Sequence, residues 1–414
     1  MKEINASIIT IGDELLIGQT IDTNSAFIAQ ELNKLGIWIR RRVAVGDVKK
    51  EILDALKEES KNSQVVLLTG GLGPTRDDIT KKVLCEYFNS GLIVNEEALN
   101  NVKDIFNKLN RPLIEINLKQ AEVPENCIVL QNKRGTAPGM WFEKEGVIIV
   151  SMPGVPNEMK GLMLHSVIPK LKSGNLPVVL HKTLLLAGKG ESEVAELIKN
   201  FENSLSPYIK LAYLPAYGLL RLRLTGRSDK SELLENDLNN AFNQLKELVK
   251  EWIIADYDTT IQEAILKLMI DNNKTLATAE SCSGGYIAHL ITSIPGSSKV
   301  YKGSIVSYAN EIKMTELKVK EETLNKYGAV SEQTVKEMFT GLLSKIDADF
   351  GIATSGIMGP DGGSEKKPVG TVWIAVGNKT DIKTIKYQLR FNRERNIEQT
   401  AIFALVNLFR LIKG

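Results

Sequence analysis

The stretch 279–285 reads Ala-Glu-Ser-Cys-Ser-Gly-Gly and combines candidate nucleophiles with glycines that let a ligand approach the backbone. It follows a strand-like run at 275–278 and precedes an apolar helical pattern that begins at Tyr286. The first turn of a helix carries unpaired N–H groups and the positive end of the helix dipole. This corner therefore predicts an anion-binding site. The alternative, an ordinary helix cap followed by close glycine packing, stays open on this stretch alone.

Two other segments in the same third of the chain have a similar character. Residues 302–313 read Lys-Gly-Ser-Ile-Val-Ser-Tyr-Ala-Asn-Glu-Ile-Lys, which predicts a strand that ends in polar groups. Residues 354–363 form a small, polar, glycine-rich loop after the apolar run 350–353. Strand ends in an α/β sheet converge on a ligand crevice, so three such loops in one segment predict a site.

Length and composition exclude several classes of protein. A chain of 414 residues predicts two or three domains. The net charge of +2 gives no indication of nucleic acid or of an acidic membrane surface as a partner. No apolar run approaches the ~18 residues of a membrane span, and the N-terminus does not resemble a signal peptide. The three cysteines, far apart, form neither a disulfide framework nor a metal pair. We expect a cytoplasmic protein without a membrane partner.

The first third of the chain alternates strands with helices. The expected strands are at 6–11, 37–45, 65–68 and 147–150. Each of them ends in a loop of small or acidic residues before a helix begins. This alternation predicts a mainly parallel sheet with helices on both faces.

The loop after the third of these strands is rich in glycine. Gly70, Gly71 and Gly73 would let the backbone approach a phosphate, and the next helix would point its N-terminus toward it. Asp77 and Asp78 follow this loop. Taken alone, these two residues are better explained as helix N-caps than as ligands.

Further carboxylates come from other strand ends of the same segment, at Glu14 and Glu158. Carboxylates brought beside a phosphate cradle repel the phosphate unless a cation bridges them. Their convergence with Asp77 and Asp78 would therefore imply a divalent metal. Because the three histidines are scattered, such a metal is expected to be a hard cation on oxygen ligands.

Six motifs together resemble the CinA family, in order and over nearly the whole chain. Three resemble its molybdopterin-binding-like N-terminal domain and three its C-terminal amidohydrolase domain. They lie at 12–14, 70–78 and 152–158, and at 279–285, 308–313 and 355–363. The resemblance implies a protein of pyridine-nucleotide salvage. In that family the C-terminal domain deamidates nicotinamide mononucleotide, and the N-terminal domain is associated with metal-dependent hydrolysis of ADP-ribose.

The segment between the N-terminal and C-terminal domains is a small α+β module that resembles the KH-like domain of the same family. It follows a linker at 169–177. Its expected elements are a strand at 178–187, a helix at 191–205, a hairpin at 210–225 and a long helix at 230–252. Nucleic acid is an unlikely partner, because the turn at 188–191 reads Gly-Lys-Gly-Glu and no aromatic platform is visible. We prefer a spacer that also packs on or dimerises the N-terminal domain, and we expect a homodimer.

The predicted fold class is α/β with three domains. A molybdopterin-binding-like three-layer domain is expected at 1–168, the KH-like α+β domain at 169–255 and an α/β amidohydrolase domain at 256–414. The last domain is expected to fold alone, because a linker and a fresh helix mark its start.

For amide hydrolysis, Ser281 is the expected nucleophile. No histidine lies in the motifs, so the expected base is Lys313 with a lowered pKa, beside Tyr308 as orienting group or acid. Cys282 is the competing nucleophile, but adjacent strand residues point to opposite faces, and a thiol without a nearby histidine usually packs as an apolar group.

The other expected groups of this domain bind the substrate. Backbone N–H groups of Gly356 and Ile357 are expected to stabilise the oxyanion. The remaining candidate contacts, mainly for the phosphate, are Ser283, Gly284, Gly285, Asn310 and Arg395. No cofactor is expected for the deamidase.

For ADP-ribose, the N-terminal domain is expected to use a divalent metal, Mg²⁺ or similar, with K⁺ as an additional candidate ion. The expected metal ligands are Glu14, Asp77, Asp78 and Glu158. The expected substrate contacts are Gly12, Asp13, Asn24, Gly70, Gly71, Gly73, Thr75 and Gly154. Two alternatives stay open for this domain: pterin binding with adenylyl transfer, and a non-catalytic nucleotide-sensing or dimerisation module.

Overall fold

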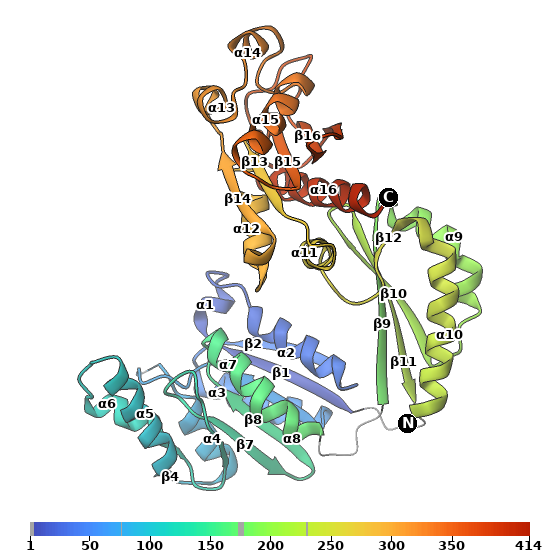
Figure 1. Ribbon diagram of the computed structural model, residues 1–414. Helices are drawn as coiled ribbons and strands as arrows, with labels where there is room; N and C mark the ends of the chain where they lie inside the picture. Colours follow the sequence, from blue (N-terminus) through green and yellow to red (C-terminus); the bar gives the residue numbers. More distant parts are fainter. Residues whose placement is uncertain (1–3, 76, 173–177, 229–230) are drawn as a thin grey trace. The chain divides into compact units, whose positions relative to one another are not determined.

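The computed structural model describes residues 4–75, 77–172, 178–228 and 231–414 (Figure 1). The chain divides into two compact units, Met1–Leu180 with Gly226–Glu235, and His181–Thr225 with Asn236–Gly414. The mixed α/β fold class is confirmed. The second half of the predicted linker, 173–177, lies outside the described residues. In the described part of the chain, no helix combines the length and the apolar character needed to cross a membrane.

The first unit is built on a six-stranded sheet with the order β2-β1-β3-β8-β7-β6. Its strands are β1 (Asn5–Ile11), β2 (Trp38–Val45), β3 (Val65–Thr69), β6 (Ile128–Leu130), β7 (Gly139–Lys144) and β8 (Val147–Met152). The first four in spatial order are parallel, as predicted, and β7 and β6 add an antiparallel edge. The carboxyl ends of β1, β3 and β8 therefore meet at one edge of the sheet.

Helices cover both faces of this sheet and make three layers. Alternation along β1 explains why, since Ala6 and Ile8 belong to one buried cluster while Ile9 and Ile11 belong to the other. The first cluster includes α2 (Thr23–Lys34), α7 (Pro156–Leu162) and α8 (Ile168–Lys172), and the second includes α3 (Lys49–Asn62) and α4 (Thr80–Phe88). The remaining elements are α1 (Asp13–Leu16), β4 (Leu92–Val94), α5 (Glu96–Lys108), α6 (Glu115–Leu118) and β5 (Glu122–Pro124).

The small α+β module lies mostly in the second unit. Its sheet has the order β10-β11-β9-β12. The elements are β9 (Val178–Ala187), α9 (Glu191–Asn203), β10 (Ile209–Ala216), β11 (Leu219–Ser228), α10 (Ser231–Val249) and β12 (Ile253–Ala255). The start of β9, the end of β11 and the start of α10 belong to the first unit. The predicted hairpin turn is present, with φ of 39° at Tyr217 and 82° at Gly218. The first residue predicted for the long helix, 230, lies outside the described residues.

The rest of the second unit surrounds a five-stranded sheet with the order β14-β13-β15-β16-β17. Its strands are β13 (Leu276–Glu280), β14 (Tyr301–Val306), β15 (Phe350–Gly356), β16 (Thr371–Asn378) and β17 (Ile382–Gln388). Its helices are α11 (Ile261–Asp271), α12 (Tyr286–Thr292), α13 (Asn310–Leu317), α14 (Glu321–Tyr327), α15 (Glu332–Lys345) and α16 (Arg393–Lys413). The first three strands in spatial order, β14, β13 and β15, are parallel. The loop expected from 354 is wrong at its start, because β15 continues to Gly356 and pairs there with Val372 of β16.

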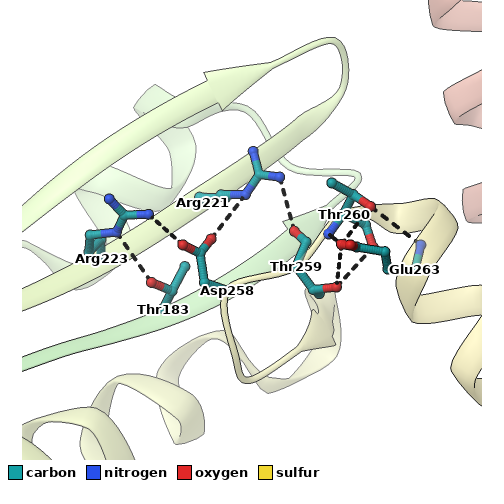
Figure 2. A network of polar contacts seen from close by, with 7 residues as sticks. All are labelled: Thr183, Arg221, Arg223, Asp258, Thr259, Thr260 and Glu263. Atoms are coloured by element: carbon teal, nitrogen blue, oxygen red, sulfur yellow. Dashed lines mark hydrogen bonds and ion pairs between the residues drawn. The ribbon is translucent and has the colours of Figure 1, made fainter. Parts of the chain in front are cut away.

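One hydrophobic core crosses the expected boundary at residue 256. Leu185, Ala187 and Leu219 of the α+β module share a buried cluster with Ile261 and Leu405. Polar contacts cross the same boundary, as Figure 2 shows: Arg223 donates to the Asp258 carboxylate at 2.8 Å, and Arg221 donates to the Thr259 carbonyl at 2.9 Å. The expectation that residues from about 256 fold alone stays a prediction, and these contacts indicate that the module adds stability to them.

We predict that a fragment of residues 181–414 unfolds at a higher urea concentration than a fragment of residues 256–414. Removal of the module exposes the apolar surface that it covers on α11 and α16, and a buried leucine contributes about 1.5–3 kcal/mol. Circular dichroism during urea titration of both fragments checks this. Equal unfolding midpoints would show that the shared core adds no stability.

Candidate active sites

The turn that carries Ser281 lies between β13 and α12. The Ser281 N–H donates to the Thr354 carbonyl at 3.0 Å, and its carbonyl accepts from Gly284 N–H at 3.2 Å. The residue is only 8% exposed. Its hydroxyl makes no hydrogen bond to any part of the chain that the structure describes. The backbone is thus fixed on both sides, while the hydroxyl is left without an internal partner.

Cys282, the competing nucleophile, is buried in the apolar core. Burial raises the pKa of its thiol to about 12, so the thiol is protonated near neutral pH. The argument from strand alternation is wrong, because β13 ends at Glu280 and both residues lie in the turn. The environment of the thiol, rather than the direction of a strand, therefore favours the serine.

Glu280 occupies the helix N-terminus that the sequence assigns to a phosphate. Its fully buried carboxylate accepts hydrogen bonds from the N–H groups of Gly285 at 3.1 Å, Ile287 at 3.0 Å and Ala288 at 2.8 Å. Glu280 is the last residue of β13, directly before the turn, so its side chain lies close to these donors. The donors at the start of α12 are therefore already used by the protein itself.

The predicted phosphate contacts at 283–285 do not fit this geometry. Ser283 is 2% exposed, and its hydroxyl bonds to that of Thr354 at 2.7 Å. Gly284 N–H donates to Ser281, and Gly285 N–H donates to Glu280. These residues shape the turn rather than present free donors to a ligand.

Lys313 is buried at the ends of β13 and β14, with 1% of its surface exposed. Its ammonium donates to the carbonyls of Ser307 at 2.8 Å and Tyr308 at 3.0 Å. Ser307 N–H in turn donates to the Glu280 carbonyl at 2.8 Å, which places the amine beside the turn that carries Ser281. Within the described ranges, Lys313 has no ion-pair partner. Burial lowers its pKa, as the sequence predicts.

The arginine that reaches the other loops of this site is Arg393. It donates to the Gly359 carbonyl at 2.9 Å and to the Tyr308 hydroxyl at 3.0 Å. The predicted Arg395 makes only a backbone bond, from its N–H to the Asn392 side chain, within the described chain. From the sequence we expect the last helix at 395–413, which placed Arg393 outside it, so Arg393 was missed; the structure begins this helix at Arg393. Asn392, an asparagine at the N-cap, was the available signal.

The predicted oxyanion donors are only partly available. Ile357 N–H donates to the Thr371 carbonyl at 2.9 Å, so Ile357 does not fit this role. Gly356 lies in β15, and Asn310 is exposed at the start of α13. Tyr308 is 65% exposed and bonded only through Arg393 and Lys313 in the described chain.

The first unit has a second candidate site at the carboxyl ends of β1, β3 and β8. A cleft of about 450 Å³ lies there. It brings together Gly12, Glu14, Gly70, Gly71, Gly73, Asp77, Asp78, Gly154 and Glu158, all of which the sequence indicates. Asn24 fixes one wall by donating to the Gly154 carbonyl at 2.7 Å. Asp47, which the sequence interpretation missed, also lines the cleft, and its N–H donates to the Asp13 carboxylate at 3.2 Å.

The cleft concentrates negative charge. Burial raises the pKa of Asp47, and repulsion by Asp13, Glu14 and Asp78 raises it further. Burial also raises the pKa of Glu158, which accepts a hydrogen bond from Asn132 at 2.6 Å. Carboxylate oxygens suit a hard divalent cation. No three His, Cys, Asp or Glu side chains among the described residues converge tightly enough to hold a metal, so further oxygens would have to come from a substrate or from water.

Asp78 is not a helix cap. α4 begins at Thr80 after Ile79, two residues beyond Asp78. The Asp78 carboxylate instead accepts hydrogen bonds from the N–H groups of Gly73 at 2.8 Å and Thr75 at 2.9 Å. Lys81, the second residue of this helix, is a further residue that the sequence did not indicate. It donates to the Gln120 carbonyl of the cleft at 2.7 Å, and burial lowers its pKa to about 8.

Comparison with known proteins agrees with this architecture. Family models match at 7–173 (probable molybdopterin binding domain), 181–255 (damage-inducible protein CinA KH domain) and 258–412 (CinA C-terminal domain). A CinA-like protein from Cytophaga hutchinsonii is 48% identical over 408 residues, covering 98% of this chain and 97% of its own. The chain belongs to the CinA family. The resemblance stated from the motifs is thereby confirmed.

A second relative matched over nearly its whole length gives the same result. A CinA-like protein from Flavobacterium psychrophilum is 44% identical over 412 residues and covers 99% of both chains. The crystal structure of competence/damage inducible protein CihA from Agrobacterium tumefaciens is 37% identical. It covers 36% of this chain and 93% of its own, with a TM-score of 0.36.

We predict that Glu280→Gln destabilises the second unit by about 2–4 kcal/mol, because an amide NH₂ would face backbone donors that now bond to a carboxylate oxygen. Urea unfolding of a fragment of residues 181–414 measures this. Glu322→Gln, at an exposed position, is the control and should change stability by less than about 0.5 kcal/mol. Equal stabilities of the two variants would contradict the role assigned to Glu280.

Proposed function

We propose that the C-terminal domain of this CinA family member hydrolyses the carboxamide of nicotinamide mononucleotide to nicotinate mononucleotide and ammonia. One observation supports the proposal: within the described chain, a buried lysine without an ion-pair partner is held at the turn that carries a serine whose hydroxyl makes no hydrogen bond. A lysine in this setting has a larger neutral fraction and acts as a base near neutral pH. The positively charged pyridinium ring of the substrate would lower its pKa further.

Each of these side chains has a separate role in the proposed amide hydrolysis. Ser281 Oγ attacks the carboxamide carbon, and its proton passes to the Lys313 amine. The protonated Lys313 then gives a proton to the leaving nitrogen. Ammonia departs, and the acyl group stays on Ser281 as an ester. Water hydrolyses the ester with Lys313 again as the base. Tyr308, held by Arg393 at 3.0 Å, orients the ring, and Arg393 with Arg395 supplies positive charge for the phosphate.

For the N-terminal domain we propose that ADP-ribose reacts with water to give AMP and ribose 5-phosphate. The cleft at the carboxyl ends of β1, β3 and β8 supports it, because a glycine loop there adjoins several carboxylates. Glu14, Asp77, Asp78 and Glu158 are the candidate ligands from which a bound Mg²⁺ or similar ion would take part of its coordination, and the other oxygens would come from the substrate and water. When bound, such an ion neutralises pyrophosphate charge and lowers the pKa of bound water.

A pterin remains the second candidate ligand of this domain, because its family model is described as a probable molybdopterin binding domain. Incubation with ADP-ribose and separately with a pterin, each with Mg²⁺, separates the two. Product formation from ADP-ribose supports hydrolysis, whereas binding or adenylylation of the pterin alone supports the second candidate. If ADP-ribose is not cleaved and the pterin is neither bound nor adenylylated, the domain is a non-catalytic module.

We predict that Ser281→Ala and Lys313→Met each lower kcat for amide hydrolysis by several orders of magnitude, since a nucleophile and its base act as one unit. The double variant should be barely slower than either single variant. Cys282→Ala is the control and should leave kcat within a few-fold, because the protonated thiol only packs. Ammonia release measures all four proteins. An inactive Cys282→Ala with an active Ser281→Ala would identify a thiol amidase instead.

We predict that chelation separates the two activities. EDTA should abolish ADP-ribose cleavage, because the carboxylates of the N-terminal cleft repel the pyrophosphate without a cation. Amide hydrolysis should keep its rate, since the proposed steps use only side chains of the protein. Both activities are measured on the same sample before EDTA and after Mg²⁺ is restored. An amidase that loses its rate in EDTA would overturn this division.

A further inference from the structure

The glycine loop of the N-terminal cleft already holds an anion, and that anion is a side chain of the protein. Asp78 Oδ1 accepts from Gly73 N–H at 2.8 Å, and Oδ2 accepts from Thr75 N–H at 2.9 Å and from the Thr75 hydroxyl. These are the donors that a phosphate oxygen would use. A side chain at Gly73 would meet the carboxylate, since an added Cβ would lie 2.5 Å from Asp78 Oδ2.

The loop is anchored independently of this carboxylate. Thr80, fully buried at the start of α4, donates its hydroxyl to the Gly70 carbonyl at 3.1 Å and its N–H to the Gly71 carbonyl at 3.2 Å. These bonds hold the base of the loop from the far side. The Asp78 side chain can therefore leave its donors without removing the support of Gly70 and Gly71.

Other carboxylates line the same cleft as Asp78. Asp78 is half-buried in this cleft, which also contains Glu14, Asp47 and Asp77, and its charge contributes to the raised pKa of Asp47. Lys81 offsets part of this charge, since the two groups interact. The contrast with Glu280 is clear, because that carboxylate is fully buried and inaccessible to a competing ligand.

We propose that Asp78 is an internal competitor for the phosphate position of the glycine loop, and that a pyrophosphate binds only by displacing it. The inference deepens the proposed function of this cleft and rests on it for the identity of the ligand. The displaced carboxylate becomes an oxygen donor for a cation beside the incoming phosphates. Anion and cation binding are therefore coupled, and each strengthens the other.

Isothermal titration with inorganic pyrophosphate in EDTA tests the competition. Asp78→Ala removes the competitor and should bind pyrophosphate about tenfold more tightly than the unaltered protein, because the three charge-assisted hydrogen bonds of the carboxylate no longer have to be broken. Asp77→Ala is the matched control. It removes an equal charge from the same cleft but no hydrogen bond to the described residues of the loop, so its affinity should rise less than about threefold.

The coupling is tested by repeating the titration with Mg²⁺. The unaltered protein and Asp77→Ala should both bind pyrophosphate more tightly with Mg²⁺ than without it. Asp78→Ala should gain less from the ion than either of them, because the donor that the anion releases is missing.

Two results would overturn the inference. In the first, Asp78→Ala gains no more affinity for pyrophosphate than Asp77→Ala does. In the second, Asp78→Ala binds pyrophosphate more weakly than the unaltered protein. Should Asp78→Ala fail to fold by circular dichroism, Asp78→Asn against Asp77→Asn gives the same comparison. The asparagine oxygen keeps one loop bond, so a smaller increase is expected, still above that of its control. No step uses hydrolysis, so a chain that shows this pattern but does not cleave ADP-ribose refutes the proposed activity alone.

Discussion

The second unit depends on one buried carboxylate. Glu280 accepts three backbone hydrogen bonds at the start of α12 and thereby fixes the turn 281–285. A buried acid without such donors would be strongly unfavourable, so the turn and the carboxylate require each other. The Glu280 carbonyl also receives the Ser307 N–H, whose own carbonyl receives the Lys313 ammonium. The proposed nucleophile and base are thus positioned by one continuous set of hydrogen bonds.

Both candidate sites contain a corner of backbone N–H groups filled by an acid from the protein. In the C-terminal domain the acid is buried and the corner is structural. In the N-terminal domain Asp78 is accessible from the cleft, and the corner can exchange its anion. The same local chemistry therefore supports two different roles, and burial decides between them.

Much of the architecture could be predicted from the sequence because it follows from local patterns. Alternation of strands and helices indicated the mainly parallel sheet of the first unit, and the carboxyl ends of β1, β3 and β8 do bring the predicted loops together. Because the motifs hold no histidine, Lys313 was predicted as a base with a lowered pKa, and the lowered pKa is confirmed. The roles of the site residues themselves stay predictions.

What could not be predicted depended on tertiary neighbours. The segment that contains Gly356 has a composition typical of a loop, yet Gly356 pairs with β16 and extends β15. Neither the filling of the α12 corner by Glu280 nor the bonds of Asp78 to its loop is encoded in spacing, because any nearby acid or a ligand would satisfy the same donors. The core shared across residue 256 joins segments that are far apart in sequence, so the expected boundary showed no sign of it.

The central claim is that Ser281 attacks the carboxamide. A crystal structure of the Lys313→Met variant soaked with nicotinamide mononucleotide tests it most directly, since slow turnover would keep the amide intact. The account predicts a carboxamide carbon about 3–3.5 Å from Ser281 Oγ, with Glu280 still bonded to the three amides of α12. A carboxamide placed against Cys282 Sγ, or a substrate phosphate in place of the Glu280 carboxylate, would contradict it.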